Sequence, residues 1–132
     1  MIVRCIRNRG TDLPRFEQTG AFYTDGTLFP VTLGRDYDVF GLVLFHGGLM
    51  VLVDLDGNAQ PVWLPVQLFE VKDPAMPAHW EFNAGTDDES VALGLEARWG
   101  YHALVTGTAH YLGLIERDPA ALTRYAAERR SN

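Results

Sequence analysis

The histidines and carboxylates of this chain are its best candidates for metal chemistry. No two histidines have the i, i+4 spacing of a helical zinc site, and the single cysteine supplies no thiolate pair. His102 and His110 can meet across a turn, with Glu96 or Glu116 as a third ligand. The sequence specifies no metal and no cofactor, so a metal-dependent hydrolase built on this group is an alternative hypothesis only.

Other catalytic patterns are incomplete. The segment from Asp54 to Asn58 begins as a calcium loop does, but Ala59 and Pro65 stand where that loop needs Gly and Glu. We therefore interpret it as a hairpin turn. Neither serine belongs to a Gly-x-Ser-x-Gly elbow, and no glycine-rich loop is followed by the lysine of a phosphate site. We expect a protein that is not an enzyme.

Acidic residues are concentrated in the middle of the chain, which favours a binding surface. The net charge is −6, and between residues 54 and 96 nine acidic residues accompany one base, so this segment carries −8. Phosphate binding needs the opposite charge, so we exclude nucleic acid as a partner. An acidic face instead steers a basic protein partner. The partner-binding residues we predict are Asp54, Asp56, Trp63, Asp87, Asp88 and Glu89.

Aromatic residues are dense in the middle of the chain, and we expect most of them in the core. Trp63 stands among apolar residues and prolines, where it can line an exposed groove, because Trp is favoured at interfaces. An aromatic groove of Tyr37, Trp63 and Phe69 defines a further hypothesis, an SH3-like domain that binds a small molecule or a peptide.

Length and composition predict one globular domain over residues 1–132, with 47% apolar and 21% charged residues. No apolar run approaches the roughly 20 residues that span a bilayer, so we expect no membrane contact. The N-terminus lacks the apolar stretch of a secretory signal, and one cysteine, Cys5, forms no internal disulfide. These features indicate a cytoplasmic protein in which Cys5 is a buried strand residue.

The segment 30–82 predicts an antiparallel β-meander. Gly-rich and Asp-Gly turn signals, which suit tight hairpins, separate three apolar runs, at 37–45, 49–53 and 61–64. The first two runs are apolar on both faces, as in a small SH3-like barrel or a sheet covered by a helix. Prolines at 61 and 65 place the third run at an edge. The flanking segments predict a strand at 2–7, a long loop at 11–35 with a short strand near 28–32, and a helical turn with a return strand at 66–71.

The segment after residue 83 predicts both a strand and helices. With the meander they make an α+β fold with a C-terminal helical segment. Residues 90–98 alternate as a strand does, 101–105 is ambiguous, and 110–117 is helical in character. Asp118-Pro119 is a helix start, because Asp caps free N–H groups and Pro fits the first turn. Leu122, Tyr125 and Ala126 form the inward stripe of that helix.

Short motifs spread over residues 1–82 form a pattern. The pattern consists of Arg4-Cys5-Ile6 with Asn8 and Gly10, Leu13-Pro14, Phe29-Pro30-Val31-Thr32-Leu33-Gly34-Arg35-x-Tyr37-x-Val39, Trp63-Leu64-Pro65, Leu68-Phe69-Glu70-Val71-x-Asp73 and Trp80-x-Phe82. It resembles a family of small uncharacterised bacterial proteins, some of which are similar to the immunity proteins encoded beside bacterial toxins. The resemblance implies an inhibitor that masks a basic toxin site, which is the leading hypothesis, and it supplies no catalytic residues.

Overall fold

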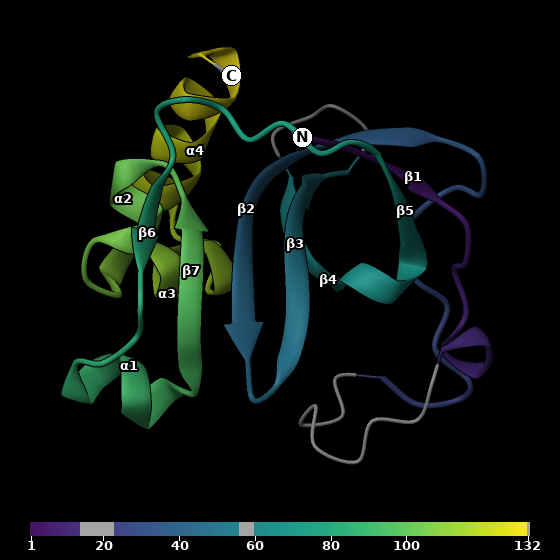
Figure 1. The fold of residues 1–132 in the computed structure, drawn as a ribbon, viewed down its shortest axis with the longest axis horizontal. Coiled ribbons are helices and arrows are strands. Elements are labelled where there is room, and N and C mark those ends of the chain that lie inside the picture. The colour runs from purple at the N-terminus through teal and green to yellow at the C-terminus, as the bar shows by residue number, and fades with distance from the viewer. Residues whose placement is uncertain (14–22, 56–59, 132) are drawn as a thin grey trace.

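The structure, a computed structural model, describes residues 1–13, 23–55 and 60–131. An antiparallel sheet and a C-terminal helix confirm the predicted α+β class (Figure 1). The strands are β1 (Ile2–Cys5), β2 (Asp36–Phe45), β3 (Gly48–Asp54), β4 (Pro61–Pro65), β5 (Phe69–Asp73), β6 (Glu81–Asn83) and β7 (Leu95–Gly100). The helices are α1 (Asp88–Leu93), α2 (His102–Val105), α3 (Ala109–Ile115) and α4 (Pro119–Ser131), with 3₁₀ turns at Gly10–Asp12 and Val66–Leu68.

The sheet divides at β2, which is long enough to pair with two strands along one side. On that side β1 pairs with Asp36–Asp38 and β7 pairs with Gly41–Phe45. β3 pairs along the opposite side. One arm of the sheet therefore has the order β4-β3-β2-β1-β5, and β7 and β6 form a second arm.

The predicted meander is confirmed as β2, β3 and β4. His46 and Gly47 make the first turn with φ values of 46° and 81°, the positive values that tight hairpin turns require. Pro61 and Pro65 bound β4, which pairs with β3 and with no other described strand, and is the predicted edge strand. Residues 56–58 of the second predicted turn lie outside the described residues.

The chain reverses after β4 and returns beside β1, as residues 66–71 predict. The turn at Val66–Leu68 leads directly into β5, which is antiparallel to β1. β4 and β5 are the two ends of the first arm and do not pair with each other in the described chain, so the sheet is open. The SH3-like barrel expected over residues 30–82 is therefore not confirmed as a closed barrel.

Residues 90–98 do not form a single strand, and here the prediction is wrong. The segment contains most of α1 and only the first part of β7. The Asp87 carboxylate accepts the backbone N–H of Ser90 at 3.0 Å and caps α1. Gly94 ends the helix in the left-handed conformation, with φ at 74°. Caps at both ends outweigh the alternating pattern, which holds only within β7.

The described part of the long connection between β1 and β2 is anchored to the core. The strand predicted near residues 28–32 is reduced to an isolated bridge at Leu28. Phe29 and Val31 are nevertheless buried, as is Leu13 near the start of the connection. The described part of the connection is therefore less irregular than its composition indicates.

The C-terminal helices follow their sequence signals. The Asp118 carboxylate accepts the N–H of Ala121 at 3.1 Å, and Pro119 begins α4, as predicted. Tyr125 is fully buried and packs edge to face on Phe40 of β2, with ring centroids 5.4 Å apart. The ambiguous segment at 101–105 contains α2.

β2 and β3 separate two cores, so both faces of the meander are covered as predicted. Val51 and Val53 enter the first core, while Leu52 between them enters the second. The first core also holds Cys5, which is buried in β1 as predicted. The second core packs the sheet against α2, α3 and α4, which gather beside β7 (Figure 1). Within the described residues, every helix is too short or too polar to span a bilayer.

Candidate functional site

An apolar pocket of about 440 Å³ lies between the sheet and α3. Its walls come from β2, β3 and β4, from α3, from the end of α1 and from the connection that precedes β2. No charged side chain is present among the described residues that line it. These residues are Thr27, Phe29, Val43, Phe45, Met50, Trp63, Leu64, Pro65, Leu93, Tyr111, Leu112 and Ile115.

The side-chain spacing along β4 and along α3 places several lining residues on the same face of each element. Trp63 and Pro65 are two positions apart in β4 and so lie on the same face of the strand. Tyr111 and Ile115 are four positions apart in α3 and lie on one face of the helix. Leu93 is the last residue of α1, where the left-handed Gly94 turns the chain. The pocket therefore lies where a face of β4, a face of α3 and the end of α1 meet.

Trp63 and Tyr111 form part of the aromatic wall, to which Phe29 and Phe45 also belong. Their ring centroids are 5.7 Å apart, and the ring planes are inclined by 43°. The indole N–H of Trp63 is buried and has no hydrogen-bond partner in the described part of the chain. Burial raises the pKa of Tyr111 to about 12, with Arg98 opposing the shift, so this phenol is uncharged near neutral pH. The wall favours an uncharged apolar group.

A smaller cavity of about 170 Å³ adjoins the pocket and shares Trp63 and Ile115 with it. Arg117 contributes the sole charged side chain among the described lining residues of the two cavities. Its Nη1 atom donates a hydrogen bond to the carbonyl oxygen of Pro61 at 2.5 Å. The other lining residues of the smaller cavity are Leu52, Pro61, Val62 and Leu114.

The predicted contact Asp54 is used inside the fold. Its side chain is only 8% exposed, and its Oδ2 lies 2.6 Å from Nε of Arg129. Oδ1 accepts the backbone N–H of Gln60 at 3.0 Å. Asp54 therefore ties the end of β3 to the last turn of α4. Its predicted neighbour Asp56 lies outside the described residues.

The predicted contacts Asp87, Asp88 and Glu89 lie together at the start of α1. Asp87 caps the helix, and hydrogen bonds from Ser90 lower the pKa of the Asp87 carboxyl. Glu89 accepts a hydrogen bond from the hydroxyl of Thr108. α1 lies at the end of the sheet opposite to Asp54 (Figure 1). The structure therefore separates these predicted residues into two groups.

The three aromatic residues predicted to share a groove lie in different cores. Tyr37 and Phe69 are buried in the first core, where they pack edge to face with ring centroids 6.1 Å apart. Trp63 packs against the second core, on the opposite face of the sheet. The pocket surrounds Trp63 with a different set of side chains.

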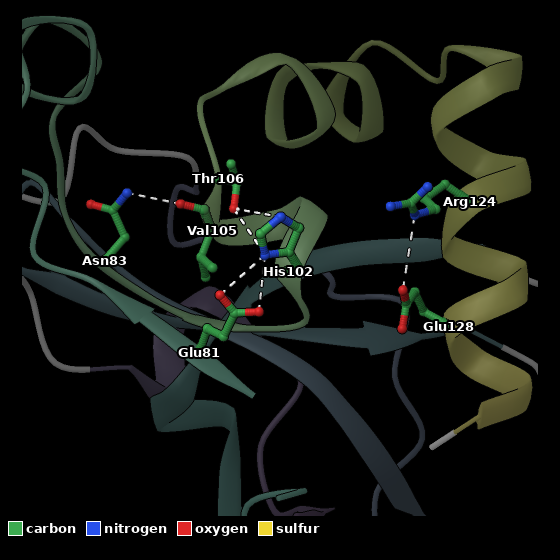
Figure 2. A network of polar contacts seen from close by, with 7 residues as sticks. All are labelled: Glu81, Asn83, His102, Val105, Thr106, Arg124 and Glu128. Atoms are coloured by element: carbon green, nitrogen blue, oxygen red, sulfur yellow. Dashed lines mark hydrogen bonds and ion pairs between the residues drawn. The ribbon is translucent and has the colours of Figure 1, made fainter. Parts of the chain in front are cut away.

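The histidines of the predicted metal group have separate partners. Nδ1 of His102 lies 3.0 Å from a carboxylate oxygen of Glu81 and 3.4 Å from the hydroxyl of Thr106 (Figure 2). Nε2 of His110 lies 2.6 Å from the hydroxyl of Tyr101. Glu96 accepts the backbone N–H of Gly47. In residues 1–13, 23–55 and 60–131, no group of three or more His, Cys, Asp or Glu residues is placed to hold a metal ion.

Sequence reasoning missed two parts of this region. It identified residues 110–117 as helical but did not use the spacing of Tyr111 and Ile115, which marks an apolar helix face. It also missed Arg98, which is fully buried beneath α1 and α2. Within β7 nothing in the sequence distinguishes this arginine from an exposed one, because its partners Leu104, Gly107 and Ser90 lie outside the strand and come near it only in the folded chain.

Comparison with known proteins supplies no relative for this site. No family model matches the chain, and neither the curated proteins nor the solved structures contain a match. The geometry of the described residues is therefore the basis for assigning a function.

Proposed function

We propose that this chain is a non-enzymatic binding domain whose apolar pocket holds the uncharged part of a small molecule. The observation that supports the proposal is the pocket of about 440 Å³ with an almost wholly apolar wall. Cavities of roughly 300–1,000 Å³ lined by apolar and aromatic side chains are typical of small-molecule sites. Trp63 and Tyr111 provide flat surfaces against which an aromatic or alkyl group can pack.

A small molecule fits this region better than an extended peptide. Peptides that bind beside a sheet usually add a strand to its edge and gain main-chain hydrogen bonds. Pro61 and Pro65 bound the edge strand β4 and have no N–H group to donate. The carbonyl oxygen of Pro61 already accepts a hydrogen bond from Arg117. An added strand would therefore find few partners at this edge.

The arrangement of the strands β4-β3-β2-β1-β5 supports a comparison with a small SH3-like barrel, which we include in this proposal. A 3₁₀ turn joins β4 to β5, and β5 returns to pair with β1. We propose that the described part of residues 1–73 is an opened relative of a small SH3-like barrel, with the pocket on its helix-covered face. A reducing cytoplasm is the location we propose, since the single cysteine is buried.

The inhibitor hypothesis stays a prediction, and the structure changes which residues are available to it. Asp54 is paired within the fold, while Asp88 is exposed at the start of α1. A basic partner would therefore contact the α1 end and not a continuous face from Asp54 to Glu96. The hydrolase hypothesis also stays a prediction, without an assembled group of ligands among the described residues.

A fluorescence titration with N-phenyl-1-naphthylamine, an uncharged aromatic probe, tests the proposed function. We expect saturable binding with one site per chain. Ile115→Glu should weaken it about tenfold or more, because a carboxylate then borders the apolar cavity. Val91→Glu is the matched control, since Val91 is an exposed helix residue that lines neither cavity. Absence of saturable binding, or equal affinity in the two variants, would contradict the proposal.

A further inference from the structure

The two cavities beside β4 form a route for an elongated ligand. They share Trp63 and Ile115, so a chain that fills the larger cavity reaches the smaller one by passing these two side chains. Ile115 is 54% exposed, which leaves its side chain room to move aside. The larger cavity has no charged lining residue in the described chain, whereas the smaller one has Arg117.

Arg117 retains hydrogen-bonding capacity at the end of this route. A guanidinium group has five N–H donors in a fixed plane. One of them is directed to the carbonyl oxygen of Pro61, which fixes the position of the group. No carboxylate pairs with Arg117 among the residues that the structure describes. A planar anion such as a carboxylate fits donors of this kind.

The backbone at Arg117 gives an independent reason to assign a role to its side chain. Arg117 has φ at 59°, in the left-handed region that residues with a Cβ atom rarely adopt. Arg117 lies just after α3. Its backbone N–H donates a hydrogen bond to the carbonyl oxygen of Leu114, and the N–H of Asp118 donates to the carbonyl oxygen of Gly113. Helices that end in this way usually place glycine at this position. An arginine here accepts backbone strain and places a cation in the smaller cavity.

We propose that the ligand is an elongated apolar molecule that ends in a carboxylate, such as a fatty acid. The apolar chain occupies the larger cavity between Trp63, Tyr111 and Leu112, and the carboxylate binds the guanidinium of Arg117 in the smaller cavity. This inference rests on the proposed function and specifies the ligand of the same site. Ile115 lies between the two parts and contacts the middle of the chain.

Competition against N-phenyl-1-naphthylamine by dodecanoate and by dodecanol tests the inference, because the two ligands share a chain and differ in the head group. We expect dodecanoate to bind about tenfold more tightly than dodecanol. Arg117→Gly should abolish this preference. Arg117→Lys should keep part of the preference for dodecanoate over dodecanol. Arg124→Gln, which removes an exposed arginine of α4, should keep all of that preference.

The outcomes separate the two proposals. Equal affinities for the two ligands in the natural chain, or a preference that survives in Arg117→Gly, would overturn the carboxylate assignment and leave the pocket proposal standing. Failure of both ligands and of the probe to bind would overturn both. Arg117→Gly should fold at least as well as the natural chain, because glycine suits the left-handed position. Arg117→Gln provides the same test with the Cβ atom retained.

Discussion

Arg98 shows how a single residue organises the helical side of the molecule. Its side chain is fully buried, and its Nη1 atom donates to the carbonyl oxygens of Leu104, at 3.0 Å, and Gly107. Nη2 donates to the hydroxyl of Ser90 at 3.3 Å, and that hydroxyl donates to the Asp87 carboxylate at 2.7 Å. Burial lowers the pKa of Arg98, and the attraction of Asp87 opposes that shift. The residue links the cap of α1 to the turn between α2 and α3.

We predict that Arg98→Met lowers the free energy of unfolding by about 3 kcal/mol, because buried carbonyl groups lose their donor. Urea denaturation followed by tryptophan fluorescence measures the change. Arg124→Met is the control, since it removes an exposed arginine and should change the free energy by less than about 0.5 kcal/mol. A cost for Arg98→Met as small as that of the control would refute the role assigned to Arg98.

His110 makes the stability of the fold dependent on pH. Burial, and secondarily the positive charge of Arg124, lower the pKa of His110 below its ordinary value of 6.5. The unfolded chain therefore binds the proton more readily than the folded chain does. The contribution of neutral His110 is fully present above pH 6.5 and is lost as the pH falls from there through the lowered pKa.

The free energy of unfolding of the natural chain should be lower at about pH 5.5 than at about pH 7, because the contribution of neutral His110 is lost. His110→Gln should reduce the difference between the two values, because the variant has no titrating group at this position. Arg124→Gln should reduce it in part, since it removes the second cause of the lowered pKa. An unchanged pH difference in His110→Gln would show that other groups control the acid sensitivity.

At the scale of elements, α4 is held to the sheet by both apolar and ionic contacts. Tyr125 packs on Phe40 of β2, and Arg129 pairs with the mostly buried Asp54 at the end of β3. Burial, and next the negative charge of Asp54, raise the pKa of Tyr125. Asp54 and Arg129 belong to elements that are far apart in sequence, so their pairing fixes where the last helix lies.

We predict that Asp54→Asn lowers the free energy of unfolding by about 2 kcal/mol, because the guanidinium of Arg129 loses its carboxylate partner. Asp88→Asn is the matched control, since Asp88 is exposed and should contribute less than about 0.5 kcal/mol. Hydrogen exchange of α4 amides distinguishes local release of the helix from global unfolding. Equal effects of the two substitutions would contradict a structural role for Asp54.

Elements with strong local signals could be predicted from the sequence. The meander has two-sided apolar strands and turn residues that accept positive φ, and Asp118-Pro119 marks the start of α4 by its capping chemistry. α1 was missed because Val91, Leu93 and Leu95 alternate as in a strand. The bounds of α1 are set by the N-cap at Asp87 and by the left-handed Gly94. These two signals come from single residues, and the periodicity of apolar residues does not contain them.

At the scale of the whole molecule, the candidate site could not be predicted because it depends on contacts between distant segments. Trp63 was identified as a candidate binding residue, but its neighbours come from α3, α1 and the connection before β2. The acidic segment from residue 54 to 96 is continuous in sequence, yet Asp54 and α1 lie at opposite ends of the sheet. Net charge alone therefore gives no information about where a binding surface is located.

The pocket is the central claim, and methyl-resolved NMR during titration with N-phenyl-1-naphthylamine tests it most directly. We predict saturable shifts of the Met50, Leu93, Leu112 and Ile115 methyl groups, which come from three different elements and meet at the pocket. The methyl groups of Val3 and Val53, in the first core, should not shift. Shifts confined to residues outside the pocket, or no saturable shifts at all, would contradict the account.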